Sequence, residues 1–308
     1  MKPDREIQLV DVVLGAYIIF LSIMVWKARA EAAAPTLLLF QLAVIFFLYF
    51  RCLQFLKKKE ATLMLMDGFR SVVLIATIPF LFLSIGNIPE ILNPKSYEAE
   101  LQAIDIKMFG VDPVLWMEQF LHPLAVDWFQ LAYISYYPLF LVGLVLFFNK
   151  RHHEFRIYIG ALAITTLGTF VGYFFVPARS PYFAAQLPEF AHLFPFTEPI
   201  KGLWIGDFLA HALDTAESVK VDCFPSGHTA GAVLVILATR KWMPRLFWVV
   251  LPIASSLIFA TVYLRYHYVI DLIAGAALAV AAFWVSGLVT DWLVRTRTDT
   301  VSTDPQEA

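Results

Sequence analysis

Charged side chains are scarce in this sequence of 308 residues. Asp, Glu, Lys and Arg together make up 16% of it, whereas 59% of it is hydrophobic. Soluble globular domains usually contain about a quarter charged residues, which keep the surface wetted. The composition therefore excludes an ordinary soluble protein and favours a chain that a lipid bilayer solvates.

Basic clusters and cysteines are also few. The formal net charge is −2, and no basic stripe interleaved with aromatic residues is present, which argues against a nucleic-acid partner. The two cysteines, Cys52 and Cys223, fall at the ends of predicted helices on opposite sides of the membrane. We therefore expect no disulfide between them, and the redox compartment stays open.

Long apolar runs are abundant by contrast. Eight intervals are nearly free of charge and approach the ~20 residues that a membrane-spanning helix needs. They lie near residues 9–26, 32–50, 71–89, 128–149, 157–178, 223–239, 246–264 and 272–290. No small-residue cleavage pattern follows the first, so it is read as a retained helix. The sequence thus predicts an all-α integral membrane protein with about eight transmembrane helices.

The distribution of Lys and Arg predicts how these helices are oriented. With eight helices both termini share one side, and that side holds fifteen of the 23 basic residues. Because Lys and Arg near helix ends are retained in the cytoplasm, we expect cytoplasmic termini. The lack of an obvious organelle signal favours a bacterial inner membrane, and residues 293–308 predict a disordered cytoplasmic tail.

Two long connections, residues 90–127 and 179–222, are predicted on the extracytoplasmic side. In the first, apolar residues at helical spacing beside a Trp in 114–121 predict an interfacial helix. The second is rich in Phe, Pro and Leu. Such a segment fits either an entry route for a lipid-like substrate or ordinary packing at the membrane face.

The first chemical motif is Pro225-Ser226-Gly227-His228, which stands at the predicted start of the sixth helix. The first N–H groups of a helix lack intrahelical partners and attract anions. Gly227 lets a phosphate approach the backbone, and Ser226 adds a hydroxyl donor. The motif is equally compatible with an ordinary cap by Ser226 beside an incidental interfacial His228.

The second motif joins His267 to Asp271 at the start of the eighth helix. Side chains four residues apart share one helix face, so Asp271 can accept a proton from one imidazole nitrogen and fix the tautomer. The other nitrogen is then free to attack. An ionisable residue beside a long apolar helix indicates a functional site, although a purely structural His–Asp pair is the alternative.

Two arginines lie on the same predicted side. Arg265 precedes the second motif by two residues, and Arg179 ends the fifth helix. A guanidinium binds phosphate oxygens through its planar fork and stays charged in a partly dry site. Both are therefore candidate phosphate ligands, and each could instead reach lipid headgroups at the membrane surface.

Together these residues predict phosphoryl chemistry. His267 would attack a phosphate ester to give a phosphohistidine, while His228 protonates the departing oxygen and then activates water or an alcohol. No cofactor or metal is required, since arginines and helix N–H groups stabilise the charge. A zinc site made by two His and one carboxylate is an alternative. A proton-coupled transporter is a more distant alternative, because transporter sites usually lie near the bilayer midplane, whereas these residues cluster at one edge of the membrane.

With these motifs, the chain resembles the type 2 phosphatidic acid phosphatase superfamily, whose members share a six-helix membrane core. The Ser226-Gly227-His228 run looks like the family's second motif, and His267 with Asp271 looks like the end of its third. The resemblance implies His267 as nucleophile, Asp271 as its orienting partner and His228 as acid and base. It covers about residues 70–292, so residues 1–69 would form two additional N-terminal helices.

Departures from the phosphatase branch favour transfer over hydrolysis. Its usual Lys and Arg-Pro pair are incomplete around Arg179, and Thr261 stands where that branch has an Arg. The run Arg265-Tyr266-His267-Tyr268 with Asp271 is closer to the inositol phosphorylceramide synthase branch. We therefore expect an inositolphosphotransferase of sphingolipid metabolism, with a phospholipid donor and a lipid alcohol such as ceramide as acceptor. A phosphatase acting on phosphatidic acid or a polyprenyl pyrophosphate is the alternative.

Overall fold

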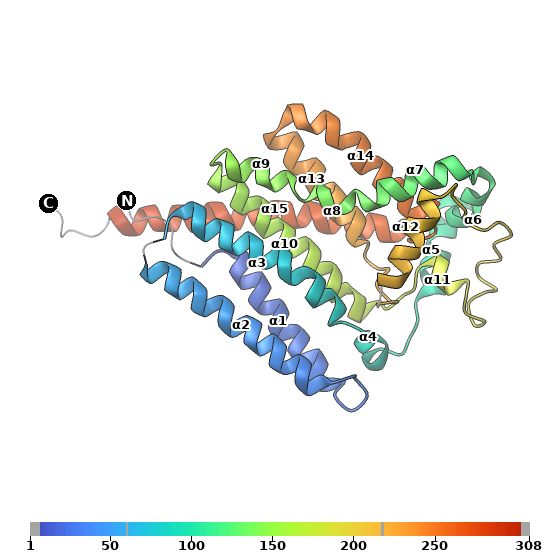
Figure 1. Cartoon of the computed structure of the whole chain (residues 1–308), viewed down its shortest axis with the longest axis horizontal. Helices are drawn as coiled ribbons and strands as arrows, with labels where there is room; N and C mark the ends of the chain where they lie inside the picture. The colour runs from blue at the N-terminus through green and yellow to red at the C-terminus, as the bar shows by residue number, and fades with distance from the viewer. Residues whose placement is uncertain (1–6, 60, 217–218, 303–308) are drawn as a thin grey trace.

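The protein is almost entirely helical in the computed structural model, which describes residues 7–59, 61–216 and 219–302 (Figure 1). The helices of the bundle are α1 (Leu9–Lys27), α2 (Pro35–Lys58), α3 (Leu63–Leu83), α7 (Pro123–Ile134), α9 (Val142–Phe148), α10 (His152–Phe175), α13 (Gly227–Trp242), α14 (Pro244–Tyr263) and α15 (Val269–Ser302). The connecting elements are α4 (Ile88–Leu92), α5 (Glu98–Phe109), α6 (Pro113–Met117), the 3₁₀ turn η1 (Glu118–Phe120), α8 (Tyr136–Leu139), α11 (Pro181–Ala184) and α12 (Ile205–Ala216).

Seven of the described segments are long and apolar enough to cross a membrane. They are α1, α2, α3, the joined α7–α9 segment Pro123–Phe148, α10, α14 and the Val269–Thr296 part of α15. The remaining expected span, residues 223–239, corresponds to α13, which has only 16 residues and packs among α10, α14 and α15. The prediction of an all-α integral membrane protein is confirmed, with seven full-length spans and one shorter inner helix.

Proline sets where many of these helices begin. Its missing N–H costs nothing in the first turn of a helix, and its fixed φ suits that position. Six helices have a proline there, namely α2, α4, α6, α7, α11 and α14. The sequence of α15 contains no proline, and this helix continues to Ser302. The tail expected at residues 293–308 therefore overlaps the end of α15 as far as Ser302, and residues 303–308 lie outside the described residues.

The third span begins earlier than the sequence predicts, at Leu63 instead of residue 71. The charges of Asp67 and Arg70 predict a helix boundary after them, yet both residues lie inside α3 and are buried. Arg70 donates from Nε to Asp11 of α1 at 2.9 Å, and Arg156 of α10 donates from Nε to Asp67 at 3.0 Å. Paired charges can lie within a span because each satisfies the other.

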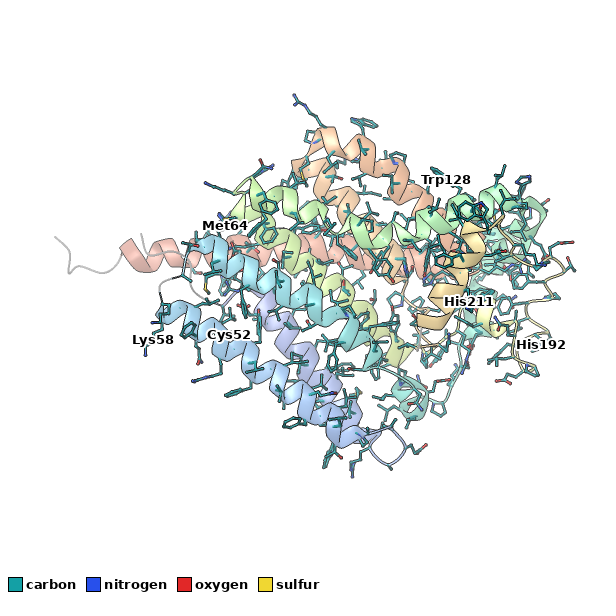
Figure 2. All side chains as sticks on the ribbon, viewed as in Figure 1. Cys52, Lys58, Met64, Trp128, His192 and His211 are labelled. Carbon is teal, nitrogen blue, oxygen red and sulfur yellow. The ribbon has the colours of Figure 1, made fainter. Side chains whose placement is uncertain are left out.

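These four charged residues, with Tyr49 of α2 hydrogen-bonded to Asp11, form what we call the buried ion cluster. It joins the first three helices to α10. Its charged members lie toward the starts of α1, α3 and α10. Met64, near the start of α3, and Lys58, at the end of α2, lie at the opposite end of the bundle from His192 (Figure 2). The N-terminal helices are thus fastened to the rest of the bundle by ion pairs as well as by apolar packing.

The two long connections pack on one another at the opposite end of the bundle, where α4, α5, α6, α11 and α12 gather (Figure 1). The interfacial helix expected over 114–121 is split into α6 and η1, with Asp112 capping α6 through the N–H of Val114 at 2.8 Å. From α5, Gln102 donates to the carbonyl of Leu193 at 2.6 Å. The connections therefore make a polar and aromatic cap over that end.

Candidate active site

The start of α13 is held directly against α15. Ser226 is the N-cap, and its hydroxyl accepts a hydrogen bond from the N–H of Thr229 at 3.2 Å. Its own N–H donates to the carbonyl of Asp271 at 3.1 Å. A Cβ on Gly275 would lie 2.3 Å from the Ser226 carbonyl oxygen, so this close approach requires glycine. The two sequence motifs are thus joined through backbone contacts.

The predicted His267–Asp271 pair is present. Nδ1 of His267 lies 3.3 Å from Oδ2 of Asp271, and both side chains are buried. The same oxygen accepts the N–H of Tyr268 at 3.0 Å. A carboxylate in this position favours the tautomer with its proton on Nδ1. The Nε2 of His267 then carries the free lone pair.

The turn between α14 and α15 presents His267 to the bundle interior. The carbonyl of Thr261 accepts the N–H groups of both Tyr266, at 2.8 Å, and His267, at 3.0 Å. Arg265 adopts φ of +63°, a left-handed conformation that is unfavourable for a residue with a Cβ. Strained backbone of this kind is concentrated at functional sites.

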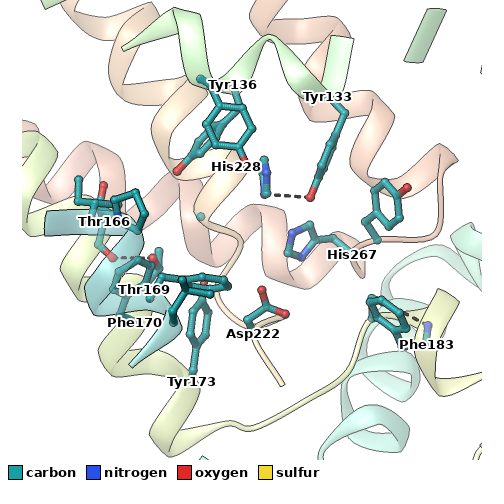
Figure 3. Close-up of a pocket in the computed structure, with 18 residues that line it drawn as sticks. Tyr133, Tyr136, Thr166, Thr169, Phe170, Tyr173, Phe183, Asp222, His228 and His267 are labelled. Carbon is teal, nitrogen blue, oxygen red and sulfur yellow. Dashed lines mark hydrogen bonds between the residues drawn. The ribbon is translucent and has the colours of Figure 1, made fainter. Parts of the chain in front are cut away.

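His228 faces His267 across the site (Figure 3). The two ring centroids are 6.1 Å apart. The His228 ring stacks on Tyr133 at 4.2 Å and packs against Tyr136 at 4.4 Å, and its Nδ1 lies 3.3 Å from the Tyr133 hydroxyl. The two tyrosines hold the orientation of the His228 ring, which lines the cavity described next.

Both histidines line a cavity of about 320 Å³. Its polar part also includes Asp222 and the hydroxyl side chains of Thr166 and Thr169 on α10. Its apolar part extends to Ile78, Pro79, Phe82 and Leu83 on α3. No Lys or Arg is among the described residues that line it. The cavity thus has a polar end, which contains the two histidines, and an apolar wall.

The two arginines predicted as phosphate ligands lie outside this lining. Arg179 is ion-paired with Glu90 of α4 and with Glu98 of α5, at 3.3 Å from the latter. Arg265 stacks over the Phe196 ring at 3.7 Å and donates to the carbonyl of Glu198 at 2.8 Å. Each therefore fastens one long connection to the bundle.

Electrostatics at the edge of the site follow from burial. Burial lowers the pKa of Arg265, and the nearby Glu118 carboxylate partly offsets this. Burial raises the pKa of Asp105 to about 6, although hydrogen bonds from two backbone N–H groups act in the opposite direction. Asp105 accepts the N–H groups of Val269 at 2.6 Å and Ile270 at 2.9 Å, and so caps α15 just before Asp271.

Some residues of the site carry no sequence signal. Cys223 donates from its thiol to Asp271 Oδ2 at 2.9 Å, and burial raises the pKa of that thiol. Lys220 places its ammonium 3.9 Å from the centroid of Phe183, a residue of the cavity wall. Cys223, His267 and Asp271 together offer three potential metal-ligand atoms. The contacts of Cys223 and of Lys220 join residues far apart in sequence, which is why no motif predicts them.

The segment that carries both motifs matches a known protein family. The family model described as PAP2 superfamily matches residues 99–285. A protein of Dictyostelium discoideum described as PA-phosphatase related is 26% identical over 220 residues, an alignment that covers 60% of this chain. The same alignment covers 40% of that relative, so this chain spans less than half of its length. No solved structure matches the chain.

Proposed function

The chain belongs to the PAP2 superfamily, and we propose that it is a membrane enzyme that transfers a phospho-headgroup from a phospholipid to a lipid alcohol. The observation that supports this best is the cavity, in which two facing histidines adjoin a wall of apolar side chains from α3. A lipid phosphate ester has both features, a reactive phosphorus and long hydrocarbon chains.

In the proposed mechanism, Nε2 of His267 attacks phosphorus and the bond to the lipid oxygen breaks. Asp271 holds the Nδ1 proton and stabilises the charged imidazole that results. His228 gives a proton to the departing alkoxide, which leaves as an alcohol. The neutral His228 then takes a proton from the acceptor alcohol, whose oxygen attacks the phosphohistidine and restores His267. The 6.1 Å between the ring centroids is a separation that one phosphoryl group can bridge.

Charge favours a phosphodiester as the donor. A phosphate monoester carries about −1.5 to −2 at pH 7, because its second pKa is about 6. A phosphodiester carries a single negative charge. The cavity lining contains Asp222 and no Lys or Arg among its described residues. Such a site stabilises one negative charge more easily than two, which supports headgroup transfer over monoester hydrolysis.

Phosphate binding is proposed at the start of α13. The free N–H groups there, with Ser226 and Gly227, supply donors and a positive helix end. Arg179 and Arg265 are proposed as further phosphate ligands. For this role each guanidinium would have to leave its present partners, which are Glu90 and Glu98 for the first and Phe196 for the second.

Lipid phosphate hydrolysis is the second candidate, supported by the description of the Dictyostelium relative as PA-phosphatase related. A direct assay separates the two. Purified protein would receive phosphatidylinositol labelled in its headgroup, with ceramide as acceptor. We expect a second labelled lipid that forms only when ceramide is present. Release of inorganic phosphate from phosphatidic acid, with no labelled second lipid, would instead establish the phosphatase.

The arrangement in the membrane is proposed from the charge bias. Residues 1–69 would be an addition to a catalytic core of residues 70–292, with the termini in the cytoplasm of a bacterial cell and the site on the outer face. A green fluorescent protein fused after Ala308 is then expected to fluoresce, since it folds in the cytoplasm. Alkaline phosphatase fused at the same residue should be inactive, and an active fusion would reverse the orientation.

A further inference from the structure

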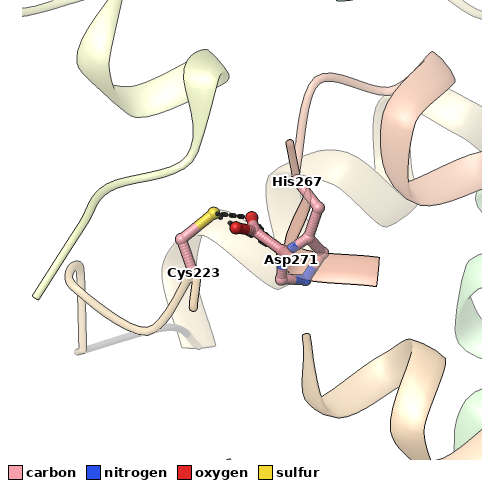
Figure 4. A group of neighbouring side chains, drawn as sticks. All are labelled: Cys223, His267 and Asp271. Carbon is pink, nitrogen blue, oxygen red and sulfur yellow. Dashed lines mark hydrogen bonds and ion pairs between the residues drawn. The ribbon is translucent and has the colours of Figure 1, made fainter. Parts of the chain in front are cut away.

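Three side chains with metal-binding atoms, those of Cys223, His267 and Asp271, converge on one another (Figure 4). Cys223 precedes α13, whereas His267 and Asp271 belong to the turn and first residues of α15. The Cys223 sulfur lies 2.9 Å from Oδ2 of Asp271 and 3.5 Å from Nδ1 of His267. The last edge of the triangle, from Nδ1 to Oδ2, is 3.3 Å.

These separations approach those around a tetrahedral zinc ion. Zinc binds Cys sulfur at about 2.3 Å, His nitrogen at about 2.0–2.1 Å and carboxylate oxygen at about 2.0–2.2 Å. At tetrahedral angles, sulfur then lies roughly 3.5 Å from each of the other two atoms, which are roughly 3.3 Å apart. Two of the three observed edges agree, and a small movement of the Asp271 carboxylate opens the third.

The second observation concerns the other oxygen of Asp271. Oδ1 is buried and has no hydrogen-bond partner among the described residues. The carboxylate itself is fully buried. A buried carboxylate with an oxygen that lacks a donor is unfavourable, and a cation bound to the same carboxylate is one way to compensate its charge. Cys223 is a free cysteine, so its sulfur is available as a ligand.

We propose that Cys223, His267 and Asp271 form an inhibitory site for a soft divalent cation, with Zn²⁺ as the ion that fits its geometry. Sulfur and imidazole ligands select Zn²⁺ over Mg²⁺ and Ca²⁺, which require sets of oxygen ligands. His267 also lines the cavity, which gives the ion a route to the site. Three protein ligands leave a fourth position for water.

Binding there removes the nucleophile. The cation takes the lone pair of Nδ1, so the single proton of the neutral His267 ring moves to Nε2. That nitrogen then has no lone pair with which to attack phosphorus. The Cys223 thiol loses its proton to solvent as the zinc–sulfur bond forms. Inhibition therefore rests on the proposed role of His267, whereas cation binding does not.

Cobalt binding tests the site without any assay of turnover. In the full-length Cys52→Ser variant, Cys223 is the sole thiol, and Co²⁺ should produce one equivalent of thiolate-to-metal charge-transfer absorption in the near ultraviolet. Cys52 is exposed on α2, at the far end of the bundle from His192 and His211 (Figure 2), so this background should leave the site intact. Added Zn²⁺ should displace the Co²⁺ and so abolish the absorption band. Absence of the band, or an equal band after Cys223→Ala is added, would overturn the site.

Turnover measurements test the inhibition. Low micromolar free Zn²⁺ is expected to lower headgroup transfer by about tenfold or more, and a strong chelator should restore it. Cys223→Ser should raise the Zn²⁺ concentration needed for inhibition by about 10- to 100-fold, since loss of even a hydrogen-bond partner of a metal ligand lowers metal affinity by that factor. Stoichiometric binding with unchanged turnover would overturn the inhibitory role. If no phosphate ester is turned over, the proposed function fails while the cobalt spectrum still decides the site.

Discussion

A His267→Ala variant is expected to lose turnover by a factor of about 10³ to 10⁶ while keeping the fold of the wild type. The imidazole is the proposed nucleophile, and no other described side chain at its position can form the covalent intermediate. Brief reaction with phosphate-labelled donor, quenched in alkali because the P–N bond is acid-labile, should label the wild type only. Near-normal turnover or retained label in the variant would overturn the assignment.

Two further variants separate this role from others. His192 is exposed in the connection between α11 and α12, so His192→Ala is a matched control that should keep wild-type turnover. His228→Ala should also be slow with a natural donor. A donor with a good leaving group needs no protonation, so it should restore the first step in His228→Ala and not in His267→Ala.

Local geometry explains which parts of the site are predictable from sequence. The spacing of His267 and Asp271 places them on one helix face, and the structure has them 3.3 Å apart. The position of Ser226 before an apolar run likewise predicts its place as the cap of α13. The number of intervening spans predicts that His228 and His267 lie on the same side, because each crossing reverses the direction of the chain.

Long-range electrostatics explains what could not be predicted. The sequence predicts that Arg179 and Arg265 lie on the same side as the histidines, but it does not predict which carboxylates pair with them. Glu90, Glu98 and Glu118 belong to the connection of residues 90–127, and their contacts depend on how that connection packs against the rest of the protein. Cys223 is missed for the same reason, since its partner Asp271 lies 48 residues away.

The same limit applies to the boundaries of the spans. A charged residue in an apolar run predicts the end of a helix when its ion-pair partner is unknown. For this reason the predicted start of α3 lies at residue 71 instead of Leu63. Asp67 and Arg70 are 2% and 1% exposed because their partners come from α1 and α10. Composition predicts that helices span the membrane, whereas the two charges inside α3 are tolerated because of ion pairs to α1 and α10 that the sequence alone does not show.

Arg70→Met is expected to destabilise the protein by about 3–5 kcal/mol, the usual cost of leaving a buried charge without its partner. Arg70 is 1% exposed, and its Nε donates to both oxygens of Asp11, at 2.9 and 3.1 Å. Removing it leaves that carboxylate in the bundle interior with Tyr49 as a hydrogen-bond donor and no cation in its place. The measurement is thermal unfolding of the purified protein in detergent, with Lys58→Met, an exposed change on α2, as the control.

A double variant distinguishes lost charge from lost packing. Arg70→Met with Asp11→Asn removes both members of the pair, so it should be more stable than Arg70→Met alone. If the double variant were less stable, side-chain packing and not charge would hold α1 to α3. The distinction bears on the site because α10, which joins the buried ion cluster through Arg156, also carries Thr166 and Thr169 of the cavity. A loosened cluster should therefore lower turnover as well as stability, although it lies at the other end of the bundle.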